Sequence, residues 1–495
     1  MTQEAFAVRE TGGLSDLFFF TGSKDCAFLG VFCFPARDFS FVSRRPVPLQ
    51  IAGNAAFSDG IPITKMMRRK EMKKIIALLM VLVMVCALAA CGQKAPAPAE
   101  QAEPTFEFDN DSTPFDVSTL SEDEVKKVKV GFIFLHDENS TYDLNFINAA
   151  REACEGLGLK EGQDFILKTG IPEGQECYDA AAELVDAGCN IVFADSFGHE
   201  SFMIQAAKEF PKVEFCHATG TQAHSAGLPN FHNAFATIFE GRYLGGVAAG
   251  MKLNEMIEKG QITAEQAKLG YIGAYPYAEV KSGYTAFFLG ARSVCPSATM
   301  EVTFTNSWYD PTLEKEGAIK LINNGCVVLS EHADSMGAPT ECESRGVPFV
   351  FYNGSAEADC PNTFIVSSRI NWVPFMQVMI GNVAKAQHLH ADWTGTMATD
   401  SVVLSDLNEK VAAPGTAEKL AEVSASLRSG TTKVFDTSTF TVGGKPLTTY
   451  SADVNDLGTF TPDTESIVNG AFAESVFRSA PSFDVDIDGI TIIDQ

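Results

Sequence analysis

The sequence predicts an α/β protein with two lobes, each built on a doubly wound parallel sheet. From residue 128 onward, short apolar runs typical of buried strands alternate with amphipathic segments of helical period. This alternation occurs twice, on either side of a long helical segment at 240–257. Alternating strands and helices form right-handed βαβ units with parallel strands. Two such series therefore predict two similar lobes.

The first series predicts lobe 1 over residues 125–238. It begins with a buried strand at 128–135, followed by a helix whose apolar face includes Phe146 and Ala150 and which ends near Gly156. The other elements expected in this lobe are strands at 165–167, 190–194 and 213–216, and helices at 177–187 and 199–210.

The second series predicts lobe 2 over residues 239–365. The expected strands lie at 269–272, 300–304, 327–329 and 348–351, and the expected helices at 279–293, 312–323 and 339–344. The remaining segment, 366–495, is helical near 372–386 and irregular beyond residue 433. We expect it to return to lobe 1 and to end as a C-terminal strap across both lobes.

The helix at 240–257 carries a stripe of small residues. Gly241, Gly245 and Ala249 recur at helical spacing, with Gly246 and Gly250 beside them. In a membrane such a stripe is a dimerisation face. In a charged chain it favours close approach to a neighbouring helix or sheet.

Residues 67–90 have the layout of a lipoprotein export signal. Cationic residues from Arg68 to Lys74 precede an apolar run of 16 residues at 75–90, which is shorter than the roughly 20 residues that a membrane-spanning helix needs. Leu-Ala-Ala directly before Cys91 matches the lipobox of bacterial lipoproteins, a resemblance that makes Cys91 the acylated residue. The alternative is an uncleaved membrane anchor with an incidental cysteine.

The segments flanking this signal carry no predicted fold. Residues 1–66 precede it and are best explained by a mis-assigned start codon. Residues 91–124 are rich in Pro, Ala and acidic residues, which predicts a flexible tether. The expected location is therefore the extracytoplasmic face of the cell membrane, with a lipid anchor.

Composition excludes a polyanionic partner. Cleavage before Cys91 leaves 405 residues with 26 basic and 56 acidic side chains, a formal charge of −30. Such a surface repels nucleic acid. Eight cysteines follow Cys91, but no Cys-x-x-Cys occurs, and their apolar contexts favour buried free thiols over a disulfide framework.

No catalytic motif is present. The sequence lacks a nucleophile elbow, a His-Glu-x-x-His pair and a P-loop, so we expect no catalytic residue and no cofactor. His388 and His390 are the one close histidine pair. A metal site would need converging ligands of mixed origin, so a solvated helix end explains the pair better and no metal is expected.

Polar and aromatic clusters follow five predicted strands. In open α/β sheets, ligands bind outside the carboxyl ends of the strands. Aromatic rings beside acids and amides suit a small, flat, polar ligand. The clusters are 136–142, Asp195-Ser196-Phe197, Trp308-Tyr309-Asp310, 332–335 and Tyr352-Asn353-Gly354-Ser355.

Three segments resemble the basic membrane protein family, the substrate-binding lipoproteins of ABC importers that are related to purine nucleoside receptors. They are 240–250, 305–311 and 331–335, and the Asn-Ser-Trp-Tyr-Asp-Pro stretch is the most specific. The resemblance implies a type I periplasmic-binding-protein fold, two lobes joined by a hinge. It also implies a purine nucleoside or nucleobase as ligand, and an ABC permease with its ATPase as partners.

The resemblance implies site residues in both lobes. Tyr142 is the stacking candidate, Asp195 matches an acid at the end of the third strand, and Trp308 and Asp334 fall on positions that face the cleft. The full candidate set of ligand-binding residues is Tyr142, Asp195, Ser196, Trp308, Asp334, Tyr352, Asn353 and Trp372. Two segments depart from the family pattern, 353–355 and 369–372, and bear on the contacts to sugar and base.

Three other functions remain open at this stage. The same fold can bind a sugar, an amino acid or another small solute. A nucleoside-processing enzyme would use Asp195 or Asp334 as a base. A purely structural surface lipoprotein would bind no ligand.

Overall fold

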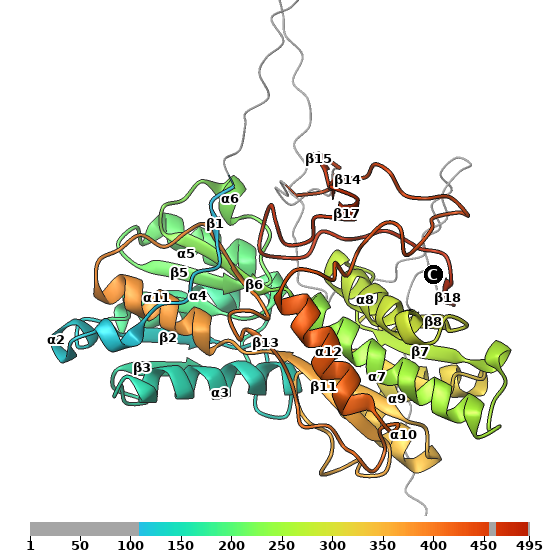
Figure 1. Ribbon diagram of the computed structural model, residues 1–495. Coiled ribbons are helices and arrows are strands. Elements are labelled where there is room, and N and C mark those ends of the chain that lie inside the picture. Colours follow the sequence, from blue (N-terminus) through green and yellow to red (C-terminus); the bar gives the residue numbers. More distant parts are fainter. Residues whose placement is uncertain (1–107, 455–461, 494–495) are drawn as a thin grey trace, which may run out of the picture. The chain divides into compact units, whose positions relative to one another are not determined.

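The computed structural model describes residues 108–454 and 462–493 (Figure 1). The predicted signal, Cys91 and most of the predicted tether lie outside the described residues. Among the helices of the described ranges, none combines the length and the apolar character that a membrane span requires. All eight described cysteines are free and buried, which confirms the expectation of free thiols.

Lobe 1 contains a seven-stranded parallel sheet in the order β1-β12-β6-β5-β4-β2-β3. Its strands are β1 (Asn110–Asp111), β2 (Val130–Ile133), β3 (Phe165–Lys168), β4 (Ile191–Ala194), β5 (Glu214–Ala218), β6 (Phe231–Ala236) and β12 (Asp392–Gly395).

Helices cover both faces of this sheet. Phe132 and Ile133 are both fully buried but belong to different apolar clusters, because successive side chains of a strand point to opposite faces. Helices α3 (Thr141–Gly156) and α11 (Val373–Ala384) pack on the face of Phe132, and α4 (Gln175–Asp186) and α5 (Glu200–Glu209) on the face of Ile133.

Lobe 2 repeats this plan. Its sheet has the order β13-β11-β10-β9-β7-β8-β18 and is parallel except for the pair β11 and β13. The strands are β7 (Lys268–Gly273), β8 (Thr299–Phe304), β9 (Val328–His332), β10 (Phe349–Tyr352), β11 (Phe364–Ile370), β13 (Val402–Leu404) and β18 (Ile490–Ile492).

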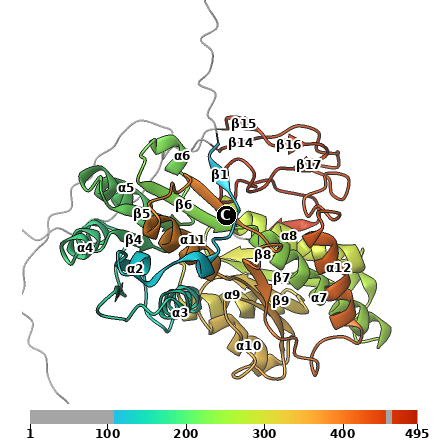
Figure 2. The ribbon, with the colours of Figure 1, turned by 60° about the vertical axis from the view of Figure 1, so that its left-hand side comes forward.

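Helices again lie on both faces of the lobe 2 sheet. One face carries α7 (Ile238–Glu258) and α8 (Ala278–Val294), and the other carries α9 (Pro311–Asn323) and α10 (Gly337–Arg345). Helix α12 (Thr416–Arg428) packs along α7 (Figure 2). The predicted α/β class with two doubly wound parallel-sheet lobes is confirmed.

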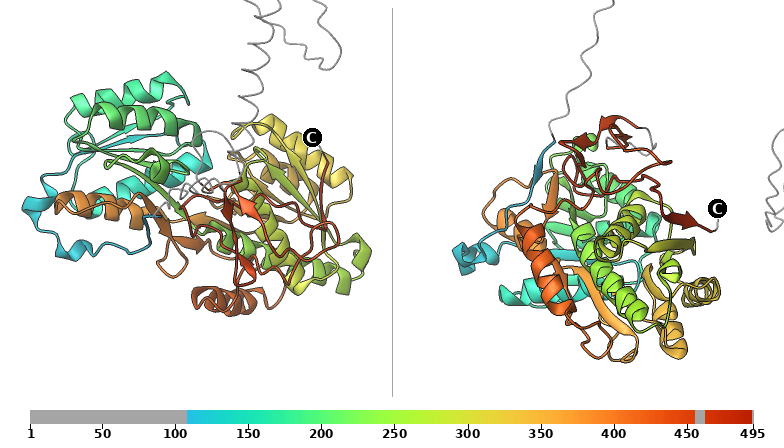
Figure 3. Two further views of the ribbon diagram at one scale, coloured as in Figure 1. Left: turned by 90° about the horizontal axis from the view of Figure 1, so that it is seen from above. Right: turned by 45° about the vertical axis from the view of Figure 1, so that its right-hand side comes forward.

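Among the described residues, connections from a strand of one lobe to the next strand or long helix in the other run from β6 to α7, from β11 to α11 and from β12 to β13. The segment after residue 366 therefore contributes to both sheets (Figure 3), and its last strand, β18, lies beside β8 (Figure 1). The short elements are η1 (Val117–Thr119), α2 (Glu122–Val125), η2 (Phe197–His199), α6 (Ala223–Ala226), η3 (Ala264–Gln266) and the hairpin strands β14 (Ser451–Ala452), β15 (Thr464–Glu465), β16 (Ile467–Val468) and β17 (Ala471–Phe472).

The small-residue stripe of α7 allows close contact with α8. A methyl group on Gly246 would meet the carbonyl oxygen of Phe287, and one on Gly250 would meet that of Ala291. On α8, a methyl group on Gly290 would meet the carbonyl oxygen of Tyr243. The two backbones thus approach each other as the stripe predicts.

We expect Gly246→Ala to destabilise the protein. The new methyl group would push against helix backbone, which cannot move as a flexible side chain does, and overpacking of this kind costs about 2 kcal/mol. The measurement is the free energy of unfolding in urea. Gly156→Ala, in helix α3, is the matched control, since its new methyl group would meet no atom within 4 Å. Equal effects of the two substitutions would contradict the close α7–α8 contact.

A buried carboxyl group organises the start of α9. Asp310 caps the helix, and its backbone N–H donates to the Glu314 carboxylate at 3.1 Å. The backbone N–H of Ser335 donates to the same carboxyl group at 3.2 Å, and its hydroxyl also donates to it. Burial raises the pKa of Glu314 from 4.5 to about 7, against the lowering effect of these hydrogen bonds.

Glu314 therefore makes stability depend on pH. Between pH 4.5 and 7 the folded state holds a proton that the unfolded chain releases, so its contribution to the free energy of unfolding falls as pH rises, by about 3 kcal/mol. We expect Glu314→Gln to remove this contribution. Urea unfolding of both proteins from pH 4.5 to 7.5 measures it, and parallel pH profiles would contradict it.

Candidate functional site

A small cavity lies where strand ends of both lobes meet. The strand order changes direction once near the middle of each sheet, where β2 lies between β3 and β4, and β7 between β8 and β9. Ligands bind at such switch points, outside the carboxyl ends of the strands. The cavity is lined by Leu135, Tyr142, Ser196, Phe197, Thr219, Glu279, Trp308, His332, Asp334 and Tyr352.

Lobe 1 contributes Tyr142 from the first turn of α3. Ser140 caps this helix by accepting a hydrogen bond from the N–H of Asp143, which places Tyr142 at the carboxyl end of β2. The Tyr142 hydroxyl donates to the backbone oxygen of Asp195 at 2.8 Å, and its ring meets Phe146 edge-on. The hydrogen bond and the ring contact together fix the position of the Tyr142 side chain.

Ser196 follows β4 in the same lobe, and two hydrogen bonds fix its position. Its hydroxyl donates to Glu173 at 2.6 Å, and its backbone oxygen accepts from His217 at 2.7 Å. Because the hydroxyl is already engaged, the Ser196 side chain shapes the cavity wall through its position.

Lobe 2 contributes two aromatic residues. Trp308 packs edge-on against Tyr275, with ring centroids 5.1 Å apart. Tyr352, at the end of β10, contacts the ring of His332 and the guanidinium of Arg242, whose carbon is 3.5 Å from the tyrosine ring centre. This cation–π contact is buried, where such contacts are strongest.

Direct contacts join the two lobes at the cavity. The N–H of Thr141 donates to the backbone oxygen of Asp334 at 3.1 Å. Phe197 of lobe 1 meets Tyr277 of lobe 2, with centroids 5.5 Å apart. The lobes are thus closed on each other, and the cavity holds about 20 Å³, room for about one water molecule.

Buried carboxyl groups set the electrostatics of this region. Burial, followed by the charges of neighbouring acids, raises the pKa of Asp195, Glu331 and Asp334 well above their ordinary values. Arg242 opposes the shift of Glu331 and Asp334 without cancelling it. These groups therefore favour the protonated form, or a partner that donates hydrogen bonds to them.

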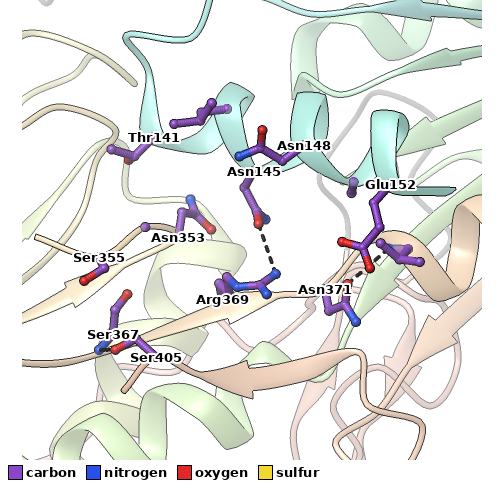
Figure 4. A pocket seen from close by; sticks show the side chains of 14 residues that line it. Thr141, Asn145, Asn148, Glu152, Asn353, Ser355, Ser367, Arg369, Asn371 and Ser405 are labelled. Carbon is purple, nitrogen blue, oxygen red and sulfur yellow. Dashed lines mark hydrogen bonds between the residues drawn. The ribbon is translucent and has the colours of Figure 1, made fainter. Parts of the chain in front are cut away.

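A second, larger cavity of about 330 Å³ lies between α3 and the strands β10 and β11 (Figure 4). Asn145 and Arg369 point toward one another across it, with 3.4 Å between the amide oxygen and the guanidinium. Asn353 also lines it, from a left-handed backbone conformation with φ of 65°. The two segments that depart from the family pattern, 353–355 and 369–372, both contribute lining residues.

The structure brings five of the predicted ligand-binding residues to the first cavity: Tyr142, Ser196, Trp308, Asp334 and Tyr352. Asp195 lies behind them, with its carboxyl accepting the N–H of Leu135 at 3.2 Å. Asn353 lines the second cavity.

Trp372 lies in neither cavity. It is buried in the apolar core, where its ring stacks on Phe146 at 4.4 Å between centroids. Trp372 lies in the connection from β11 to α11, where it is the N-cap residue of α11. The sequence alone leaves a core role open for this tryptophan.

Phe197, Thr219, Glu279 and His332 line the first cavity but do not belong to the candidate set. Phe197 and His332 stand in the predicted strand-end clusters, beside residues that do belong to it. Glu279 begins a helix after β7, and Thr219 follows β5, so the same strand-end rule would find both. Among the described residues, one group of potential metal ligands comes together, Asp109, His388 and His390, and none of these lines the cavity.

Comparisons with known proteins place the chain in a family of solute-binding proteins. The model of the PnrA-like family of ABC transporter substrate-binding proteins matches residues 128–427. A purine-binding protein of Brucella abortus is 32% identical over 253 residues, which cover 50% of this chain and 67% of the relative. An ABC transporter protein of Haloferax volcanii, named as glucose-binding, is 32% identical over 186 residues, 38% of this chain and 44% of the relative.

Solved structures support the fold. A solute-binding protein of an ABC transporter from Conexibacter woesei has a TM-score of 0.51 at 19% identity, covering 62% of this chain and 98% of that one. One from Aeropyrum pernix has a TM-score of 0.51 at 17% identity, covering 62% and 93%. The chain belongs to the PnrA-like family of ABC transporter substrate-binding proteins, and it is an extracytoplasmic solute-binding protein rather than an enzyme.

Proposed function

We propose that this protein binds a purine nucleoside or nucleobase between its lobes and delivers it to an ABC permease. The observation that carries the proposal is the first cavity, where aromatic rings from both lobes and the carboxyl groups of Glu279 and Asp334 meet at the two switch points. The purine-binding relative from Brucella abortus supports the same ligand class.

The side chains suit a neutral, flat heterocycle. Tyr142 and Trp308 offer ring faces and edges from opposite lobes, and stacked aromatic pairs contribute about 0.5–1.5 kcal/mol beyond the apolar area they bury. Asp334 can accept hydrogen bonds from ring N–H or amino groups. Ligand N–H groups that bind these acids favour their ionised form, so a nucleotide phosphate on the same ligand would meet like charge and should be rejected.

Ligand uptake requires the lobes to separate. The closed cavity is far smaller than a purine. The hydrogen bond from Thr141 to Asp334 joins the two lobes beside it. In the open form the rings move apart, and a bound ligand then contacts both lobes and favours closure. The closed, loaded form is the state that the permease would accept.

The second cavity supplies room for a sugar. Its amides and the Arg369 guanidinium can hydrogen-bond to hydroxyl groups, and its volume lies at the lower end of ordinary ligand sites. The adjacent pairs Thr141/Tyr142 and Tyr352/Asn353 each place one residue in each cavity. A nucleoside could therefore set its base in the first cavity and its ribose toward the second.

We expect Trp308→Ala to weaken purine binding by about 10- to 100-fold, because it removes a large apolar ring from the cavity wall. Isothermal titration calorimetry of the purified protein against adenosine, guanosine, their free bases and their 5′-monophosphates measures the effect. Tyr178→Ala is the control, since this ring in α4 donates its hydroxyl to Glu209 within lobe 1 and lines neither cavity.

Two outcomes of this titration would overturn the proposal. The absence of binding heat with every base and nucleoside would exclude a purine ligand. Equal losses in the two variants would exclude Trp308 from the site. Glucose and other neutral sugars belong in the same panel, because the polar second cavity and the relative from Haloferax volcanii favour a sugar as the second candidate.

The lipid anchor is part of the same proposal. The apolar run at 75–90 and the lipobox before Cys91 support acylation of the Cys91 thiol, and two or more acyl chains suffice for stable membrane attachment. Residues 110–111 form β1 of the lobe 1 sheet and 122–125 form α2, so the tether proposed at 91–124 is shortened to the segment between Cys91 and β1, which would link the lobes to the lipid.

We expect Cys91→Ala to abolish acylation and to move the protein out of the detergent phase in a detergent partition experiment. Intact-mass measurement would show the loss of the acyl chains. Cys86→Ala, inside the apolar run, is the control and should remain acylated. An unchanged lipid mass in the Cys91 variant would exclude this site.

A further inference from the structure

The structure brings Asp109 to the histidine pair that the sequence left without a third ligand. Asp109 directly precedes β1, and the two histidines lie in the loop before β12, 279 and 281 residues further along the chain. Candidate ligand atoms of Asp109, His388 and His390 all lie within 4.8 Å of one another. The side chains are accessible, with exposed fractions of 42%, 66% and 42%.

The geometry is close to that of a tetrahedral metal centre. Zn²⁺ bonds of 2.0–2.1 Å separate neighbouring ligand atoms by about 3.4 Å. The distance from His388 Nε2 to Asp109 Oδ2 is 3.3 Å. His390 Nδ1 lies 2.5 Å from Asp109 Oδ1, so a cation would need to move these half-exposed groups apart by about 1 Å.

The backbone holds the ligands in place. Asp392 N–H donates to the Asp109 backbone oxygen at 2.9 Å, and Ala391 N–H donates to the Asp109 carboxylate at 3.0 Å. The pairing of β1 with β12 continues this contact through Asn110 and Asp392. The His390 backbone oxygen also accepts a hydrogen bond from His232 at 2.9 Å. These hydrogen bonds therefore fix the Asp109 carboxylate and the His390 backbone relative to each other.

A second carboxylate lies near the His390 ring, beyond hydrogen-bond distance. Asp111 Oδ2 lies 4.0 Å from His390 Nε2, the ring nitrogen that would remain free when Nδ1 binds a metal. Metal-bound histidines ordinarily donate this second N–H to a carboxylate or carbonyl, which fixes the ring orientation.

We propose that Asp109, His388 and His390 bind a divalent transition metal, Zn²⁺ in the first place, with a water molecule in the fourth position. Two imidazoles and one carboxylate are a donor set that suits Zn²⁺ better than Mg²⁺ or Ca²⁺, which prefer oxygen ligands. The ion would clamp β1, the first described strand, to β12 of lobe 1. The metal would then stabilise the point at which the segment after Cys91 enters the lobe 1 sheet.

Calorimetric titration of Zn²⁺ into the chelator-treated full chain tests this site. The cysteines of the chain can also bind Zn²⁺, so the test is the difference between proteins. We expect the double variant His388→Ala/His390→Ala to bind one Zn²⁺ fewer, and Asp109→Asn to weaken the same site by at least about 10-fold. His136→Ala is the matched control, because His136 is a partly exposed histidine outside the group.

An unchanged Zn²⁺ stoichiometry in the double variant would overturn the proposal. If the double variant fails to fold, His388→Gln alone gives the same test, because its side chain is largely exposed and contacts Asp109. A second readout is thermal unfolding. Zn²⁺ should raise the midpoint of the protein and of His136→Ala by more than that of the histidine variants.

Discussion

The cleft between the lobes is governed by buried carboxyl groups that nearby cations do not balance. Asp195, Glu331 and Asp334 are each almost fully buried, and each has its pKa raised chiefly by burial. A buried anion without a partner is costly, so such groups take up protons or require donors. Arg242 supplies part of that balance, but it is also engaged with Tyr352 and the backbone oxygen of Glu331.

This constraint connects the fold to ligand choice. Both sheets point their strand ends at the same cleft, so acids that follow separate strands converge when the lobes close. A neutral ligand with N–H or amino groups offsets their desolvation, whereas an anionic ligand adds to it. The contact between Thr141 and Asp334 couples this chemistry to closure, because Asp334 both lines the cavity and accepts the bond that joins the lobes.

Much of this arrangement could be predicted from strand order and strand ends. The rule that ligands bind beyond the carboxyl ends of parallel strands led to Tyr142, Trp308 and Asp334, which come together as expected. Trp372 entered the candidate set through the family resemblance, and the sequence did not separate it from Trp308, because a tryptophan can point either into a cleft or into the core. The stacking of Trp372 on Phe146 depends on how α11 packs against α3.

The sequence by itself determined most strands and helices between residues 128 and 352, though not β6, together with the two-lobed parallel architecture and the likeness to substrate-binding proteins, because these depend on local apolar periodicity and on short motifs. Tertiary structure alone decided which side chains share a cavity, how Asn353 and Arg369 come to line a second one, and how Asp109 reaches His388 and His390. Those contacts join residues up to 281 positions apart. No local pattern encodes such separations, because they arise only when the sheets pair their strands and the lobes close.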